Sequence, residues 1–232
     1  KSDNYDITVF DQESKIASLA SGNYVGIVSP NLTADNNHSD QFHTLGYQTL
    51  LEFINEHKSK LDICSTGTLT LLNNHKELKR YTKIFNDRII HKDIAVLIDS
   101  NHVKKNYDID SANHAVYYPN AVSLVPKTLC ELWITMSKAT LNLNFKFISM
   151  NKSSNNKWVL NFDNCESEFD IVVFAGGHKL FNTISQLEKI PTFTSQGQLT
   201  VIDKCFDIDN TIIDNGYIIP NYQDNLQVIG AT

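Results

Sequence analysis

Apolar and polar residues form short alternating runs along the chain, and these runs predict strands and helices. Residues 6–11 alternate in this way and end on the carboxylate of Asp11, which predicts a strand. Residues 169–174 are mostly apolar, a composition typical of a parallel strand buried on both faces. These two segments are the expected parallel strands of the fold.

Three stretches place apolar residues at helical spacing: residues 40–57, 76–85 and 127–139. Asp40 is expected to cap the first helix. Pro126 is expected in the first turn of the third, where its missing N–H would be unpaired in any case. The apolar stripe of the first helix is Phe42, Leu45, Leu50, Phe53 and Ile54. The stripe of the third is Leu129, Leu132, Trp133 and Met136. Both stripes are interpreted as core packing.

Most other apolar runs predict strands. Residues 144–149 and 157–162 flank a polar turn and predict a hairpin. Residues 115–119 predict a strand that enters a turn at Tyr118-Pro119. Further strands are expected at 67–72, 193–202, 216–220 and 226–231, and the type of the apolar run 93–98 stays open. The expected fold class is mixed α/β, with antiparallel strands mainly between and after the two parallel ones.

The composition sets broad limits on function. The chain has 232 residues, which fits one large domain or two small ones. Its net charge of −6 gives no general basic field, so a nucleic-acid substrate would require a local basic patch or a second domain. No apolar run approaches the roughly 18 residues of a membrane span, and no leader segment is visible. The sequence starts at Lys1, and we expect both ends to be cut from a longer protein.

The cysteines and histidines carry no metal-binding pattern. The four cysteines, Cys64, Cys130, Cys165 and Cys205, are widely spaced and form no Cys-x-x-Cys pair. Free thiols in a reducing cytoplasm are therefore expected. The eight histidines form no His-x-His or His-x-x-x-His pair, so no metal site is expected.

Two segments of small residues can let a large or phosphorylated group approach the backbone. The first is Ala20-Ser21-Gly22-Asn23, and the second is Ala175-Gly176-Gly177-His178 directly after the apolar run 169–174. Taken alone, the first segment also fits an ordinary polar loop. In dinucleotide-binding folds the second strand ends on an acidic residue that binds ribose hydroxyls, and Asp11 is in the corresponding position at the end of its strand. The glycine-rich turn that precedes such a strand is not in this sequence.

Taken in order, these segments resemble the FAD-dependent oxidoreductases of the D-amino-acid oxidase and glycine oxidase superfamily. Within it they look most like the C-terminal oxidoreductase domain of the bifunctional bacterial enzymes of 5-methylaminomethyl-2-thiouridine biosynthesis in tRNA. The matching pieces are Ala20 to Asn23, Tyr118-Pro119, Ala175 to His178, Gly197-Gln198, Gly216-Tyr217 with Pro220, and Ile229 to Ala231. They span almost the whole sequence, and their order is more specific than any one of them.

The resemblance implies an FAD cofactor and a set of residues around it. Asp11 would bind the adenosine ribose, and Ile148 would lie near the adenine. The residues implied at the flavin and its pyrophosphate are Ser21, Gly22 and Asn23. Those implied near the cofactor phosphates are Ala175, Gly176 and Gly177. We expect this piece alone to hold FAD weakly, because the helix N-terminus that binds the pyrophosphate is not among these residues.

The resemblance also implies a substrate pocket. Tyr217 stands where related amine oxidases have a substrate-facing tyrosine, and Gln198 would lie near the same pocket. His178 matches a histidine of the nearer relatives and has no assigned role. The sequence departs from the family pattern at Tyr24, where a basic residue is common, at Asn120 to Ser123, where paired glycines and an aromatic residue are usual, and at Gln196, where wider relatives have arginine.

The resemblance implies two domains. Residues 1–66 and 150–190 would be parts of an incomplete Rossmann-like FAD-binding domain. Residues 67–149 and 191–232 would form a substrate domain with a mixed, largely antiparallel sheet, together with the connections.

The reaction implied is the oxidative removal of the carboxymethyl group from carboxymethylaminomethyl-uridine at the tRNA wobble position. A methyltransferase domain that uses S-adenosylmethionine would lie elsewhere in the same cytoplasmic polypeptide. A small-molecule amine oxidase resembling glycine or sarcosine oxidase is the alternative, and the net charge favours it. A basic patch from Lys104-Lys105, Lys127 or Lys179 would favour tRNA. A third hypothesis is a binding or scaffold fragment without activity.

Overall fold

The computed structural model describes residues 5–107, 109, 114–177, 180, 184, 190–193, 195 and 197–231. The chain divides into two compact units. Unit 1 comprises Lys1–Gly22 and Cys130–Gln196, and unit 2 comprises Asn23–Leu129 and Gly197–Thr232. The expectations for His178, Lys179 and Gln196 lie outside the described residues.

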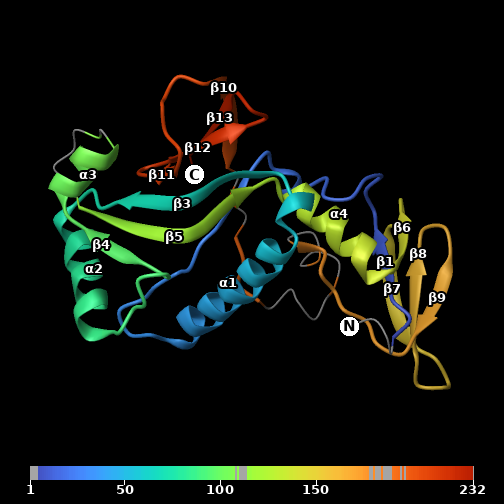
Figure 1. Cartoon of the computed structure of the whole chain (residues 1–232). Helices are drawn as coiled ribbons and strands as arrows, with labels where there is room; N and C mark the ends of the chain where they lie inside the picture. Colours follow the sequence, from blue (N-terminus) through green and yellow to red (C-terminus); the bar gives the residue numbers. More distant parts are fainter. Residues whose placement is uncertain are drawn as a thin grey trace. The chain divides into compact units, whose positions relative to one another are not determined.

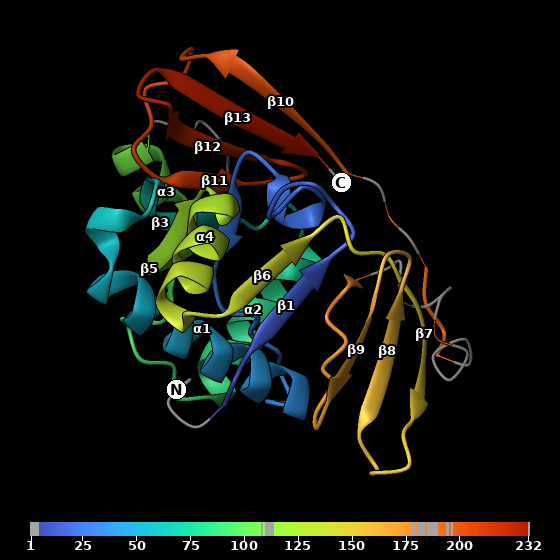
Figure 2. The same cartoon turned by 90° about the vertical axis from the view of Figure 1, so that its right-hand side faces the viewer.

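Unit 1 is built from a parallel pair of strands and a three-stranded antiparallel sheet (Figure 2). Its strands are β1 (Thr8–Asp11), β6 (Thr140–Leu143), β7 (Phe147–Lys152), β8 (Trp158–Phe162) and β9 (Glu166–Phe169). β1 pairs in parallel with β6, and the antiparallel sheet has the order β7-β8-β9. The parallel strand that ends at Asp11 and the predicted hairpin are therefore confirmed.

Aromatic rings connect the two sheets of unit 1. Phe10 of β1 stacks on Phe162 of β8, with ring centroids 4.3 Å apart. Phe145 and Phe169 meet the same Phe10 ring edge-on, at 5.6 Å and 5.8 Å. Such pairs add to the free energy gained by burying the rings, so this cluster fixes β1 against the antiparallel sheet.

Unit 2 contains an eight-stranded sheet in which β3 and β5 run side by side as the longest strands (Figure 1). The order is β10-β13-β12-β11-β3-β5-β2, and β4 also pairs with β5. The strands are β2 (Gly26–Val28), β3 (Ile63–Leu71), β4 (Val96–Ile98), β5 (Ala115–Leu124), β10 (Gln198–Asp203), β11 (Thr211–Ile213), β12 (Tyr217–Tyr222) and β13 (Leu226–Ala231). β3 and β11 pair in parallel, and the other pairs are antiparallel. The mixed α/β class is thus confirmed.

Four α-helices complete the described elements. They are α1 (His38–Glu56), α2 (His75–Asp87), α3 (Ser100–Tyr107) and α4 (Pro126–Ser137), with short 3-10 turns η2 (Ala20–Gly22) and η3 (Lys58–Lys60). One core of unit 2 packs Ile84 of α2 against Val116 and Tyr118 of β5, all buried. Pro126 begins α4, as predicted.

The N-terminus of α1 differs from the prediction. Asn37 caps the helix and accepts a hydrogen bond from the Asp40 N–H, so the prediction of an Asp40 cap was wrong. Asp40 is instead 1% exposed and forms an ion pair with Arg88 at 2.6 Å. Its carboxylate also accepts from the N–H of Thr33. The pairing with Arg88 explains the burial, because a buried carboxylate requires a partner.

The predicted turn at Tyr118-Pro119 was also wrong, because β5 continues through Pro119 to Leu124. The pairing of β5 with β3 is irregular at this point, where the register shifts between Thr66 and Thr68. Proline has no N–H to donate, and such an irregularity is one of the few places where a sheet tolerates it. Gly67, with φ of +86°, lies at the same irregularity.

The apolar run 169–174 does not form the buried parallel strand that was predicted. β9 ends at Phe169 in the antiparallel sheet, and residues 171–176 belong to no strand. Ile171 is 69% exposed and Val173 is 84% exposed. A strand buried on both faces needs a neighbour on each side, and within the part of the chain that the structure describes no strand pairs with this segment.

Two predicted helix stripes are only partly buried. In α1, Ile54 is buried but Phe42 and Leu45 are exposed. In α4, Leu129 and Leu132 are buried as predicted, whereas Trp133 and Met136 are about half exposed, at 44% and 46%. Among the described helices, none is long and apolar enough to cross a membrane.

Candidate functional site

Asp11 lies at the carboxyl end of β1, where the parallel pair with β6 ends. Its Oδ1 accepts a hydrogen bond from the Glu13 N–H at 2.9 Å. Its backbone carbonyl accepts from Phe145 N–H at 3.0 Å. The carboxylate is thus fixed at the carboxyl end of a parallel strand, where open α/β sheets bind their ligands.

The loop with Ser21, Gly22 and Asn23 begins as the 3-10 turn Ala20–Gly22. The Gly22 N–H donates to the Leu19 carbonyl at 2.8 Å. A Cβ at position 22 would overlap the Ala17 carbonyl oxygen, so the chain's own backbone already requires glycine here. Ser21 and Asn23 are exposed on either side of it, and unit 2 begins at Asn23.

The second small-residue segment also lies in unit 1, and its residues 175–177 are exposed. Gly177 has φ of +62°, which side chains rarely adopt, and a Cβ there would meet open space. Phe174 contacts Phe147 of β7 at 5.2 Å between ring centroids. Ile148, the next residue of β7, is 52% exposed. Unit 1 therefore places the start of this segment beside the strand that carries Ile148.

Tyr217 is the first residue of β12 and lies opposite Gly230 of β13. A Cβ at Gly230 would overlap the ring of Tyr217, so this ring lies directly over the glycine. Tyr217 is partly buried, and burial raises the pKa of its hydroxyl. The side chain is therefore a neutral phenol at pH 7, able to donate a hydrogen bond.

Gln198 and Tyr217 lie at the same end of the sheet but on different faces. Leu199 of β10 lies opposite Gly230, as Tyr217 does on the other side. Opposed residues share a face and neighbours along a strand alternate, so Gln198 faces the other side. Both strands pair with β13, one on each side of it, and the two side chains point to opposite faces of the sheet.

Tyr222, to which the sequence assigned no role, shares the face of Tyr217. β12 contains one more residue than β13 between the pairs Ile219–Val228 and Tyr222–Leu226, which is a β-bulge. Asn221, with φ of +55°, lies inside it. A Pro-Asn step within an apolar strand is the one local signal for such a bulge.

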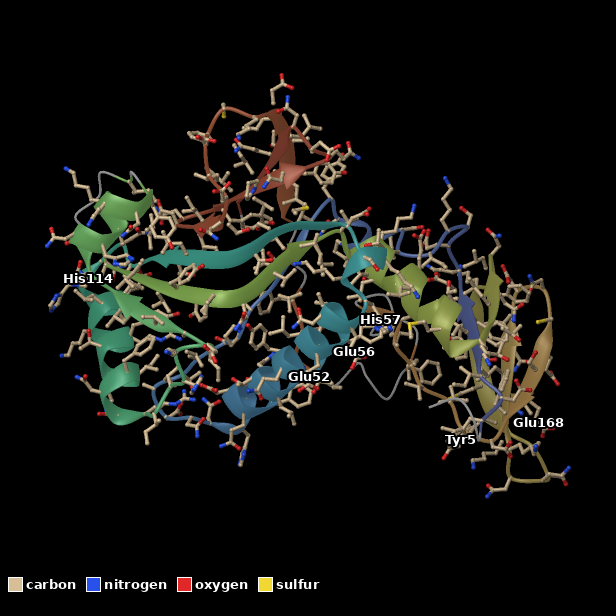
Figure 3. All side chains as sticks on the ribbon, viewed as in Figure 1. Tyr5, Glu52, Glu56, His57, His114 and Glu168 are labelled. Atoms are coloured by element: carbon tan, nitrogen blue, oxygen red, sulfur yellow. The ribbon has the colours of Figure 1, made fainter. Side chains whose placement is uncertain are left out.

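Titratable groups elsewhere form no comparable site. Glu52, Glu56 and His57 lie at the C-terminal end of α1, as Figure 3 shows. Both carboxylates are exposed, and the His57 ring packs on Phe53 at 4.5 Å. Among the described residues, no group of three His, Cys, Asp or Glu side chains could hold a metal ion. All four cysteines are free, and burial, followed by the nearby Asp62, raises the pKa of Cys64 to about 11.

The residues proposed for a basic patch are exposed but do not form one element. Lys104 and Lys105 lie in the last turn of α3, and Lys127 lies in the first turn of α4. All three are exposed.

Comparison with known proteins gives consistent matches along the chain. A family model described as FAD dependent oxidoreductase (DAO) matches residues 1–232. The chain is 23% identical, over 241 residues, to the tRNA 5-methylaminomethyl-2-thiouridine biosynthesis bifunctional protein MnmC of Haemophilus ducreyi. That match covers 97% of this chain and 35% of the relative, so the chain spans about a third of the length of the curated relatives it matches.

Solved structures with the same fold include glycine oxidase from Geobacillus kaustophilus. The TM-score is 0.75 at 15% identity, covering 100% of this chain and 65% of that one. L-alpha-glycerophosphate oxidase from Mycoplasma pneumoniae, solved with FAD bound, has a TM-score of 0.72 at 12% identity, covering 97% and 64%.

Proposed function

Because the chain belongs to the DAO family of FAD dependent oxidoreductases, we propose that it is part of an enzyme that uses FAD to oxidise a carbon–nitrogen bond. The substrate we propose is the carboxymethylaminomethyl group of the wobble uridine in tRNA. The observation that carries this narrower proposal is the similarity, over 97% of the chain, to a protein named for 5-methylaminomethyl-2-thiouridine biosynthesis.

The residues assigned to the cofactor, all in unit 1 except Asn23, have features that suit a dinucleotide. Asp11 presents a fixed carboxylate at the end of a parallel strand, a position suited to ribose hydroxyls. Ser21, Gly22 and Asn23 offer an exposed loop of small and polar residues. The exposed segment that ends at Gly177, with Ile148 on the strand beside it, offers backbone to phosphates and an apolar contact to adenine.

The chemistry follows from the substrate. FAD, when bound, would supply the acceptor for the hydride from the carbon next to the carboxylate, with dioxygen as the final electron acceptor. Hydrolysis of the substrate imine would release glyoxylate and leave aminomethyl-uridine. Tyr217, held as a neutral phenol, would orient the substrate by donating a hydrogen bond. Gln198, which faces the other side of its sheet, would act on the substrate only from that side.

We assign the rest of the pathway to the longer polypeptide. The relative is named a bifunctional protein, and we propose that its second function corresponds to the methyltransferase domain, using S-adenosylmethionine, that the resemblance implies. The assignment of residues 1–66 and 150–190 to an FAD-binding domain, with the remainder as substrate domain, belongs to the same proposal, as does a cytoplasmic location.

A small-molecule amine oxidase is the second candidate. The net charge of −6 favours it, because a tRNA-binding surface needs local positive charge. This candidate predicts turnover of free glycine or sarcosine.

The test uses the complete gene product. A yellow protein that releases peroxide with tRNA from cells lacking this gene, and converts its carboxymethylaminomethyl-uridine to aminomethyl-uridine by nucleoside mass spectrometry, supports the proposal. Peroxide release with glycine or sarcosine but not with tRNA favours the second candidate. A colourless protein that cannot be reconstituted with FAD contradicts both and favours a binding fragment.

A further inference from the structure

The β-bulge in β12 creates a continuous aromatic and apolar face in unit 2. The residues opposite Gly230, Val228 and Leu226 are Tyr217, Ile219 and Tyr222. Alternate residues of β13 share one face, so these three side chains do too. All three belong to one packed cluster with Val25 and Val228. Without the extra residue, Tyr222 would point to the opposite face.

A third tyrosine extends this face. Tyr24 contacts Tyr222, with ring centroids 5.8 Å apart and planes tilted by 57°. Its neighbour Val25 is buried in the cluster, whereas Tyr24 itself is 48% exposed. The Tyr222 hydroxyl accepts a hydrogen bond from Gln223 at 3.4 Å. One ring is thus anchored and the other is open to solvent.

The position of Tyr24 in the chain connects this pair to the proposed site. Tyr24 directly follows Asn23, which is assigned to the flavin, and it stands where the family pattern often has a basic residue. Tyr222 shares its face with Tyr217, which is assigned to the substrate. The two rings therefore belong to the same two segments as the residues assigned to cofactor and substrate.

We propose that Tyr24, supported by Tyr222, is a stacking platform for a nucleobase of the RNA substrate. This inference rests on the function proposed above. Exposed aromatic rings are the usual means of holding an unpaired base, and Tyr24 lies in the loop just before β2, with its ring against that of Tyr222. Tyr24 follows Asn23, where the family often has a basic residue. In this chain, stacking on a planar ligand would take the place of a contact made by that positive charge.

The test measures RNA binding by the full-length, FAD-loaded protein without turnover. The probe is a fluorescently labelled anticodon stem-loop with an unpaired wobble uridine, followed by anisotropy. Tyr24→Ala should weaken its Kd about tenfold or more, the loss expected for one base stack. Tyr24→Phe keeps the ring and should stay within about twofold of wild type. Tyr5→Ala removes another exposed tyrosine, in unit 1, and should leave the Kd unchanged.

Turnover provides a second readout. For tRNA, Tyr24→Ala should raise KM more than it lowers kcat, with the flavin content measured by absorbance for each variant. Equal Kd values for Tyr24→Ala and wild type would contradict the stacking platform, as would a loss of affinity in Tyr24→Phe as large as in Tyr24→Ala. Either result could occur while the wild type still oxidises tRNA, so the proposed function would stand. A wild-type protein that neither binds the stem-loop nor oxidises tRNA overturns the proposed function and the platform together.

Discussion

The two units differ in how far they bury the apolar residues of strand-like segments. In unit 2, Leu69 and Val116 lie on paired central strands and are completely buried. In unit 1, Ile171 and Val173 come from a run that is more apolar than β3 or β5 but are 69% and 84% exposed. The difference is pairing, because β3 has a neighbour on each side whereas residues 171–176 pair with no described strand. Apolar composition predicts burial only where the sheet supplies neighbours.

The units also differ in what holds them together. Unit 2 buries polar groups that satisfy one another: Thr211 bonds to Ser65 and Ser123 at 2.8 Å and 2.6 Å, and Asp40 pairs with Arg88. Unit 1 relies on the ring cluster around Phe10. A buried polar group destabilises the fold when its partner is lost. The most damaging single substitutions should therefore remove a buried polar partner in unit 2 and an aromatic ring in unit 1.

The largest expected loss comes from Asp40→Ala in unit 2. Removing this carboxylate leaves Arg88 partly buried without its ion-pair partner and the Thr33 N–H without an acceptor. Such a loss costs about 3–5 kcal/mol. Thermal unfolding should show the lower stability, and hydrogen exchange should rise most in α1 and α2, which Asp40 and Arg88 connect, with unit 1 less affected.

The matched control is Asp87→Ala. It removes an aspartate from an exposed pair with Lys83, whose side chains are 63% and 49% exposed. That pair should contribute little to stability, because water screens the two charges. Equal losses from the two substitutions would contradict the role given to the buried pair.

Phe10→Ala should produce the largest loss in unit 1. It removes a stacked contact to Phe162 and two edge contacts, and we expect about 2–4 kcal/mol because the ring is only partly buried. Hydrogen exchange should rise in β6 to β9. Phe42→Ala, at a residue 76% exposed in α1, should cost less than about 0.5 kcal/mol. If exchange in β3 and β5 rises as much as in unit 1, the two units are not separate cooperative structures.

Gly230→Ala should cost about 1–3 kcal/mol, because the new methyl group forces the Tyr217 ring out of its place. In a Tyr217→Ala background the same change should be nearly neutral, and this double-mutant cycle measures the coupling. Gly46→Ala is the control: it lies in α1 with nothing within 4 Å of the added methyl, so it should stabilise the helix slightly. Additive effects at positions 217 and 230 would show that the glycine does not position the ring.

These comparisons indicate what the sequence could predict. The strand that ends at Asp11 and the hairpin followed from local alternation, and the structure confirms both. The burial of Asp40 depends on Arg88, which is 48 residues away. The face of Tyr222 depends on a bulge defined only by pairing with β13. Local patterns predict elements, whereas partners distant in sequence decide which side chains an element buries.

The smallest expected effect is at Ile171, and it tests the contrast between the units most directly. Ile171→Ser replaces a residue that is 69% exposed, so the stability of this chain should change by less than about 0.5 kcal/mol. Leu160→Ser, at a residue only 6% exposed in the same unit, should cost several times more, because it removes buried apolar surface and buries a hydroxyl. Denaturant unfolding of both variants gives the two values. If the same Ile171→Ser change proved costly in the longer polypeptide but neutral in this chain, a segment outside these 232 residues would be covering the apolar run, and pairing rather than composition would again decide what is buried.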